Sequence, residues 1–292
     1  MKRNNPVERL FSILVFLFLY APIAVLIVFS FNASNSRRVF TGFSLQWYAE
    51  FFQDARILGA LRTTLTISVL AALIATIAGT AAAIGFFGMR KRPRHICMAV
   101  NNIPLTNADI ITGVSMMLLF VFAIQIFNSS LGETLGIRWK MGFATLLIAH
   151  ITFNIPYVIL SVMPKLRQLD PNIYEAAQDL GATGLYAFRK VIFPEILPGV
   201  VNGGIIAFTM SIDDFLISYF TKGSGITTLA VEIYNMTKKP VTPEINALST
   251  LLFLSVLTLL IIVNVRQARQ EKAARQKAAA LIQREPIPSG EA

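Results

Sequence analysis

Two adjacent acids, Asp213 and Asp214, lie inside a segment, residues 200–220, that is otherwise apolar enough to cross a membrane. A charged side chain at the centre of a bilayer costs roughly 2.5–3.5 kcal/mol on insertion scales, so two in succession need a partner or a function. The segment contains no basic residue that could neutralise them. Carboxylates in this setting are suited to binding a cation that passes through the membrane.

The two acids cannot face the same way if the segment is one continuous helix, because successive helical residues differ by about 100°. On such a helix Asp214 shares a polar stripe with Ser211 and Ser218. We therefore expect Asp214 to line a substrate pathway and Asp213 to face a neighbouring helix.

A second interpretation is that the acid pair only holds a helix bundle together, for example by hydrogen bonds to His150. Asp109 is a weaker candidate for the pathway. Asp favours the first positions of a helix, so Asp109 is also expected to cap the helix that restarts after Pro104.

Several kinds of chemistry are not supported. The lone Cys97 cannot form an intramolecular disulfide, and His95 and His150 are the only histidines, so the sequence predicts no metal site. No Gly-x-x-x-x-Gly-Lys-Ser/Thr loop occurs, so the chain lacks this route to cradling ATP phosphates. We expect no enzymatic activity and no bound cofactor.

A polar stretch, residues 175–200, precedes the acid-bearing segment. Asp170 is a plausible N-cap and Pro171 a plausible first residue for a helix through Glu175. Gly181 and Gly184 then predict a turn. A second helix, residues 186–191, is expected to end at the two prolines that follow, Pro194 and Pro198.

The elements that position these residues are membrane helices. The chain is 54% hydrophobic and 14% charged with a mean hydropathy of +0.61, whereas soluble domains carry about a quarter charged residues. About twenty apolar residues span a bilayer. Six segments qualify: residues 11–31, 61–88, 104–127, 141–163, 200–220 and 246–265. The sequence thus predicts an all-α protein whose solvent is membrane lipid.

Most of the 26 Lys and Arg residues lie at the termini and in the second and fourth connections. The positive-inside rule places these segments, and hence both termini, in the cytoplasm. The net charge of +10 is explained in this way without nucleic acid as a partner. The expected divisions are a cytoplasmic start (1–10), a first span with a periplasmic loop (11–60), a core (61–265, with the fourth loop at 164–199) and a partly disordered cytoplasmic tail (266–292).

The fourth loop resembles the EAA loop of ABC-importer permeases. Glu-Ala-Ala is followed by Gly181 at the family's spacing, and Val191 and Phe193 stand where the family usually has Ile and Leu. The resemblance covers about residues 61–265. It implies a type I permease fold whose loop is a coupling helix that docks on a separate ATPase subunit, which would hold ATP and Mg. The coupling residues implied are Glu175, Ala176, Ala177, Asp179, Gly181 and Pro194.

Three further stretches, HITFNIPYVI, SIDDFLISYF and PEINALSTLLF, are similar to spermidine/putrescine permease subunits. This resemblance implies an importer in a bacterial inner membrane with spermidine or putrescine as cargo. It also implies a periplasmic polyamine-binding protein, a second permease subunit and a dimer of ATPases as partners. An importer of another small organic substrate, or an ion-coupled secondary transporter, remains an alternative on the residues alone.

Overall fold

The structure is a computed structural model that describes residues 6–34, 39–130, 134, 136, 138–170, 172–238, 245–258, 260–262, 265 and 269. Over these residues every element is helical apart from an isolated bridge between Asn32 and Phe43. Six helices are long and apolar enough to cross a membrane: residues 9–30, 55–88, 109–129, 143–168, 184–213 and 245–262. The expected all-α membrane fold with six spans is confirmed. Pro171 and nearly all of the predicted tail, 266–292, lie outside the described residues.

The chain divides into two units, one formed by residues 1–48 and 242–292 and the other by residues 49–241. The first unit contains α1 (Pro6–Ser30) and the last candidate span. The short α2 (Gln46–Phe51) carries Trp47, whose indole N–H donates to the carbonyl of Asn32 at 2.6 Å. This loop after α1 is therefore an ordered structure with a buried aromatic side chain at its centre.

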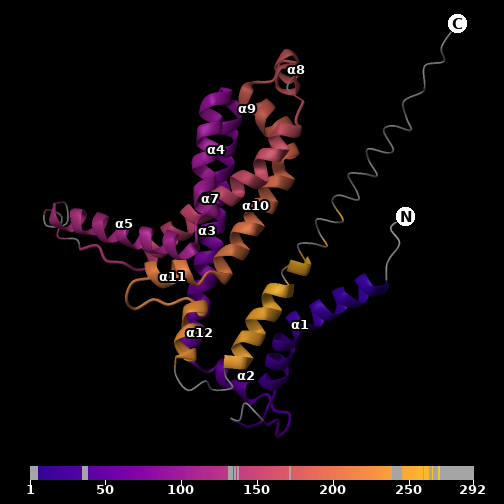
Figure 1. Cartoon of the computed structure of the whole chain (residues 1–292). Coiled ribbons are helices and arrows are strands. Elements are labelled where there is room, and N and C mark those ends of the chain that lie inside the picture. Colours follow the sequence, from indigo (N-terminus) through magenta and orange to yellow (C-terminus); the bar gives the residue numbers. More distant parts are fainter. Residues whose placement is uncertain are drawn as a thin grey trace. The chain divides into compact units, whose positions relative to one another are not determined.

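The second unit is built on three helices that pack together: α3 (Ala55–Gly88), α7 (Phe143–Gln168) and α10 (Phe193–Asp213). Figure 1 shows them side by side. Small residues allow the close approach, since a Cβ on Gly79 of α3 would lie 2.7 Å from the Val158 Cβ of α7. A Cβ on Gly199 of α10 would likewise lie 2.8 Å from the Ser161 carbonyl oxygen.

Between α3 and α7 the described residues form two long helices. One is α4 (Lys91–Thr106), which runs beside α3 and α7, and the other is α5 (Asp109–Ser129), which packs on α11 (Leu216–Thr221) (Figure 1). The expected third span, residues 104–127, began too early, because Pro104 lies within α4. Helix α4 instead ends at Thr106, because Asn107 and Ala108 adopt extended backbone before α5 begins.

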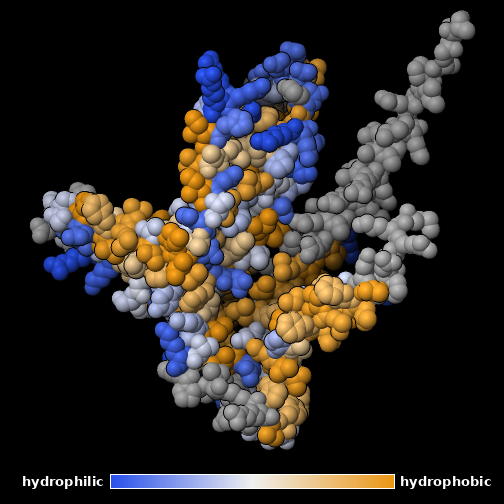
Figure 2. Space-filling view, in the orientation of Figure 1, coloured by the Kyte–Doolittle hydropathy of each residue, from blue (hydrophilic) through white to orange (hydrophobic). Residues whose placement is uncertain are grey.

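The described residues of the unit also form four shorter elements: α8 (Ile173–Asp179), α9 (Gly184–Ala187), a π-helical turn η1 (Phe188–Ile192) and α12 (Leu229–Thr237). The elements α8, α9 and η1 occupy the connection between α7 and α10, at the end of the unit where α4 begins (Figure 1). Hydrophilic residues gather at this end, whereas apolar surface covers much of α5 (Figure 2).

Candidate functional site

The connection between α7 and α10 forms a helical hairpin, as expected, but its first helix is capped differently. Asn172 is the N-cap residue of α8, whereas the Asp170 carboxylate accepts a hydrogen bond of 2.9 Å from the backbone N–H of Asn172. The predicted capping by Asp170 was therefore wrong by two residues, because its carboxylate closes a local turn ahead of the helix. Glu175 lies in the first turn of α8 and Asp179 at its end, both exposed.

The turn after α8 depends on glycine. Gly181 has φ +86°, which L side chains rarely adopt, and its backbone N–H donates to the Gln178 carbonyl at 2.8 Å. The next N–H, from Ala182, donates to the Ala177 carbonyl at 3.1 Å. These two bonds close the end of α8 and reverse the chain toward α9.

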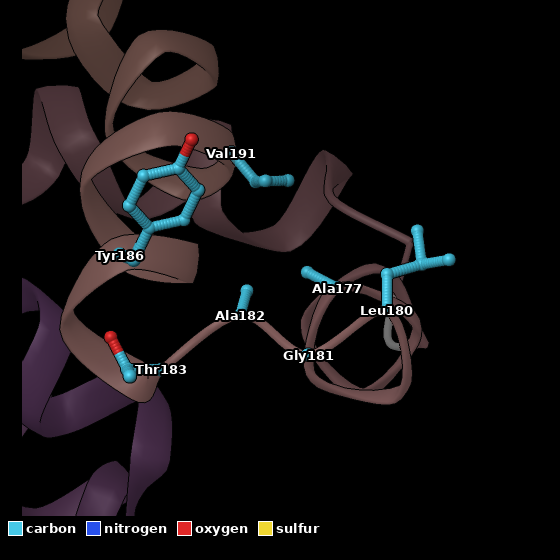
Figure 3. A pocket seen from close by; sticks show the side chains of 7 residues that line it. All are labelled: Ala177, Leu180, Gly181, Ala182, Thr183, Tyr186 and Val191. Atoms are coloured by element: carbon cyan, nitrogen blue, oxygen red, sulfur yellow. The ribbon is translucent and has the colours of Figure 1, made fainter.

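A cavity of about 470 Å³ opens on the hairpin. Ala177 enters from α8, Gly181 and Ala182 form the turn, and Tyr186 and Val191 lie on the opposite side (Figure 3). Leu180, also at this rim, is 91% exposed. An open, largely apolar recess beside an exposed leucine is a surface suited to receiving another protein.

The second helix of the hairpin does not end at Pro194 and Pro198, contrary to the sequence prediction. The π-turn η1 widens the helix so that the Phe193 N–H reaches the Phe188 carbonyl, and α10 continues directly from it with Pro194 in its first turn. Pro194 has no N–H and so makes no helical hydrogen bond of its own, and it follows directly on the π-turn, where the hydrogen bonds span five residues. The hairpin is thus joined to α10 by continuous helix.

The opposite end of α10 breaks at the acid pair. The helix ends at Asp213, and α11 begins at Leu216, so the predicted single helix over residues 200–220 was wrong. Asp214 supplies the reason, because its carboxylate accepts the backbone N–H groups of Ile217 at 3.3 Å and Ser218 at 2.7 Å. It satisfies donors at the start of α11 that have no helical partner.

Buried polar side chains of α7 meet the two sides of this break. His150 Nε2 shares a hydrogen bond of 3.0 Å with Ser218 Oγ and lies 3.7 Å from Asp214 Oδ2. One turn away, Asn154 Nδ2 donates to Ser211 Oγ at 2.6 Å. The contact to His150 that the bundle-holding interpretation expected is therefore present, and Asn154 is a partner that the sequence alone did not single out.

The exposure of the two acids is the reverse of the expected order. The Asp214 side chain is only 8% exposed, whereas Asp213 belongs to the exposed residues and forms no ion pair or hydrogen bond with the described part of the chain. The stripe argument failed because Asp214 is no longer on a helix shared with Ser211 and Ser218. Which carboxylate contacts a substrate stays a prediction.

Other groups around the break can also receive a cation. Asp109 is exposed in the first turn of α5, directly after the N-cap residue Ala108, so the expected capping by Asp109 was wrong by one residue. Phe215, Tyr219 and Tyr234 form an aromatic cluster with ring centroids 4.7–5.9 Å apart. Aromatic faces attract ammonium groups. Tyr234 comes from α12 and the other two rings from the start of α11, so sequence analysis did not bring the three together.

Comparison with known protein families identifies the family of this chain. The profile described as "Binding-protein-dependent transport system inner membrane component" matches residues 75–276. The chain belongs to this family. The match includes α7, the hairpin and α10, so the coupling-loop resemblance and the family match fall on the same part of the chain.

Curated relatives cover nearly the whole chain. It is 38% identical to the putrescine transport system permease protein PotI of Escherichia coli (strain K12) over 92% of this chain and 93% of that protein. It is 35% identical to the spermidine/putrescine transport system permease protein PotC of Haemophilus influenzae over 86% of this chain and 93% of the relative.

A solved structure with the same fold is that of a bacterial ABC transporter involved in the import of the acidic polysaccharide alginate. Its TM-score is 0.72 at 18% identity, over 90% of this chain and 94% of that chain. At this identity the likeness concerns the fold alone. It confirms that the helices are arranged as in an ABC-importer permease.

Proposed function

We propose that the chain is a permease subunit of an ATP-driven importer of polyamines, with putrescine or spermidine as cargo. The observation that carries the proposal is Asp213, an exposed carboxylate at a helix break within a chain whose relatives are named for polyamine transport. An ionised carboxylate at membrane depth is too costly to face lipid, so it faces a hydrated pathway or a partner subunit. An ammonium group of a polyamine is a matching ligand.

The residues around the break between α10 and α11 have different roles in the proposed transport. Asp213 and Asp109 supply negative charge to the pathway, and Phe215 and Tyr219 offer ring faces to a second ammonium group. The Tyr234 ring packs on both and already receives the Lys238 ammonium group, 4.6 Å from its centroid. Asp214 is a positioning residue, because it caps α11 and thereby sets the direction of the aromatic side chains. Ser211 and Ser218 hold α10 and α11 on α7 through Asn154 and His150.

The hairpin is the element through which ATP hydrolysis on a partner would act. Its recess and the exposed Leu180 are available for docking on an ATPase subunit, with ATP and Mg bound by that partner. The docking contacts we propose are Glu175, Ala176, Ala177, Asp179, Gly181 and Pro194. A displacement of the hairpin is passed through η1 into α10, because no flexible residue interrupts the helix between them.

The assembly we propose contains further chains. Two ATPase sites that close together need two coupling hairpins, and the described part of this chain supplies one, so a second permease subunit completes the pathway. A periplasmic polyamine-binding protein delivers the cargo, in accordance with the family's description as binding-protein-dependent. The basic hairpin end and both termini then face the cytoplasm of a bacterial cell.

The test is uptake of labelled putrescine and spermidine into vesicles that contain the complete transporter. Asp213→Asn should reduce ATP-dependent uptake about 10- to 100-fold, the value expected for a lost charged hydrogen bond. Asp170→Asn removes the same charge from the exposed segment before α8 and should leave uptake unchanged. Uptake that persists without ATP and collapses with an ion gradient would instead identify a secondary transporter, and ATP-driven uptake of other solutes alone would contradict polyamines as cargo.

A further inference from the structure

The loop after α1 is hydrogen-bonded to the end of that helix. The backbone N–H of Ser44 donates to the Phe31 carbonyl at 2.8 Å. The hydroxyl of Tyr48 shares a hydrogen bond of 2.7 Å with the hydroxyl of Ser30, which is the last residue of α1. The loop therefore returns to the point where the helix ends.

Three large apolar side chains of this loop are exposed. The Phe43 ring stacks on Phe31 with the centroids 5.2 Å apart, and the Phe40 ring meets Phe29 edge-on at 6.5 Å. Phe40, Phe43 and Leu45 are nevertheless 46%, 71% and 56% exposed. We call these three residues the apolar loop face. Its two rings are held in place on one side and are open to a further contact on the other.

The length of α1 sets the depth of this face in a bilayer. The candidate span runs from Arg9 to Ser30, so its 22 residues are about 33 Å long at 1.5 Å per residue. A hydrocarbon core is about 30 Å thick, and the charged Arg9 belongs at its boundary. Ser30 then lies at the opposite boundary. Because Phe29 and Phe31 flank Ser30, the rings that pack on them lie at this boundary too.

We propose that the apolar loop face inserts into lipid at the boundary between headgroups and acyl chains. Phe and Leu are among the side chains with which interfacial segments enter a membrane, to a depth of about 5–10 Å. A soluble partner would have to reach past the headgroups to contact rings that lie beside the last turn of a span. Lipid is therefore the occupant that the depth favours. The proposal does not depend on the cargo of the transporter.

The experiment measures the depth of spin labels in the complete transporter, reconstituted in phospholipid vesicles with partner subunits that lack cysteine. Cys97→Ser removes the one cysteine of this chain, and Phe40→Cys, Phe43→Cys or Leu45→Cys then carries a single nitroxide. Collisions with oxygen, which concentrates in hydrocarbon, are compared with collisions with a water-soluble nickel chelate. Each label should collide more with oxygen and lie about 5–10 Å below the phosphates. Glu50→Cys, at an exposed acid of α2, is the control and should collide more with the nickel chelate.

The two collision rates separate the possible occupants. Excess collision with the nickel chelate at the three labelled positions would place the apolar loop face in water and overturn the proposal. Low rates with both probes would mean that a protein, such as the second permease or the binding protein, covers the face, and this would overturn it as well. Leu45→Cys keeps the test decisive if loss of a ring disturbs the loop, because this variant leaves both rings in place.

Discussion

The Asp214 carboxylate accepts a hydrogen bond of 2.7 Å from the backbone N–H of Ser218, and this bond starts α11 where α10 has just ended. One acid of the pair is thereby used within the protein, and its neighbour Asp213 remains exposed. The pair thus combines a structural carboxylate with one that is available to a ligand.

These different roles predict different effects of the two alanine variants on the free energy of unfolding. Asp214→Ala should lower the free energy of unfolding by about 1–2 kcal/mol, as expected for loss of a helix cap, and Asp214→Asn by less because an acceptor oxygen remains. Asp213→Ala should change stability by no more than about 0.5 kcal/mol. Thermal unfolding of the purified protein in detergent measures both, and an equal loss of stability in the two alanine variants would contradict these roles.

The sequence predicted the six spans well because hydrophobic length alone decides them. The prediction of one helix over residues 200–220 failed at Asp213 and Asp214. Helical periodicity assigns each residue to a face of a continuous helix, and it cannot show that the Asp214 side chain caps a new helix. Asn154 was missed for a related reason. An amide on a buried helix face becomes meaningful only when Ser211, distant in the chain, lies opposite it.

The hairpin shows the same limit in another form. Glycine and proline chemistry correctly indicated the turn at Gly181. Pro194 and Pro198 were misjudged because a proline within a continuing helix and one that ends a helix look alike in a sequence. The π-turn before Pro194 depends on its connection to α10, which no local pattern indicated.

The contact between α3 and α7 gives a second prediction. Gly79→Ala should destabilise the protein by about 1–3 kcal/mol, because the new methyl group would overlap Val158 in a packed interface. Gly85→Ala, on the same helix, meets nothing within 4 Å and should leave stability unchanged or slightly raised. The difference between their unfolding temperatures is the measurement, and equal values for the two variants would show that α3 and α7 do not pack this closely.

Asn32 gives a third prediction, on the loop after α1. Its amide donates to the Val39 carbonyl at 2.9 Å and its oxygen accepts the Thr41 N–H at 2.9 Å, while its own carbonyl accepts the Trp47 indole. Asn32→Ala should release the loop at a cost of about 1–2 kcal/mol, because the Val39 carbonyl and the Thr41 N–H lose their partner.

The readout is Trp47, which is 6% exposed. In a Trp139→Phe background its emission should move to longer wavelength and become accessible to acrylamide when Asn32 is replaced. Asn128→Ala is the matched control, since the Asn128 side chain bonds the backbone of residue 139 and not this loop. An unchanged spectrum in the Asn32 variant would mean that the amide does not order the loop.

Gly181 gives the last prediction, which concerns the hairpin. A Cβ at this position meets nothing within 4 Å, so the only obstacle to a side chain is the φ of +86°. Gly181→Ala should therefore cost about 1–2 kcal/mol in the hairpin alone, enough to weaken association with an ATPase subunit about 5- to 30-fold while α3, α7 and α10 stay folded. Gly181→Asn should recover part of the association, because Asn tolerates positive φ better than Ala. Co-purification of the ATPase measures this order, and equal association by the Ala and Asn variants would show that the backbone conformation at Gly181 does not control docking.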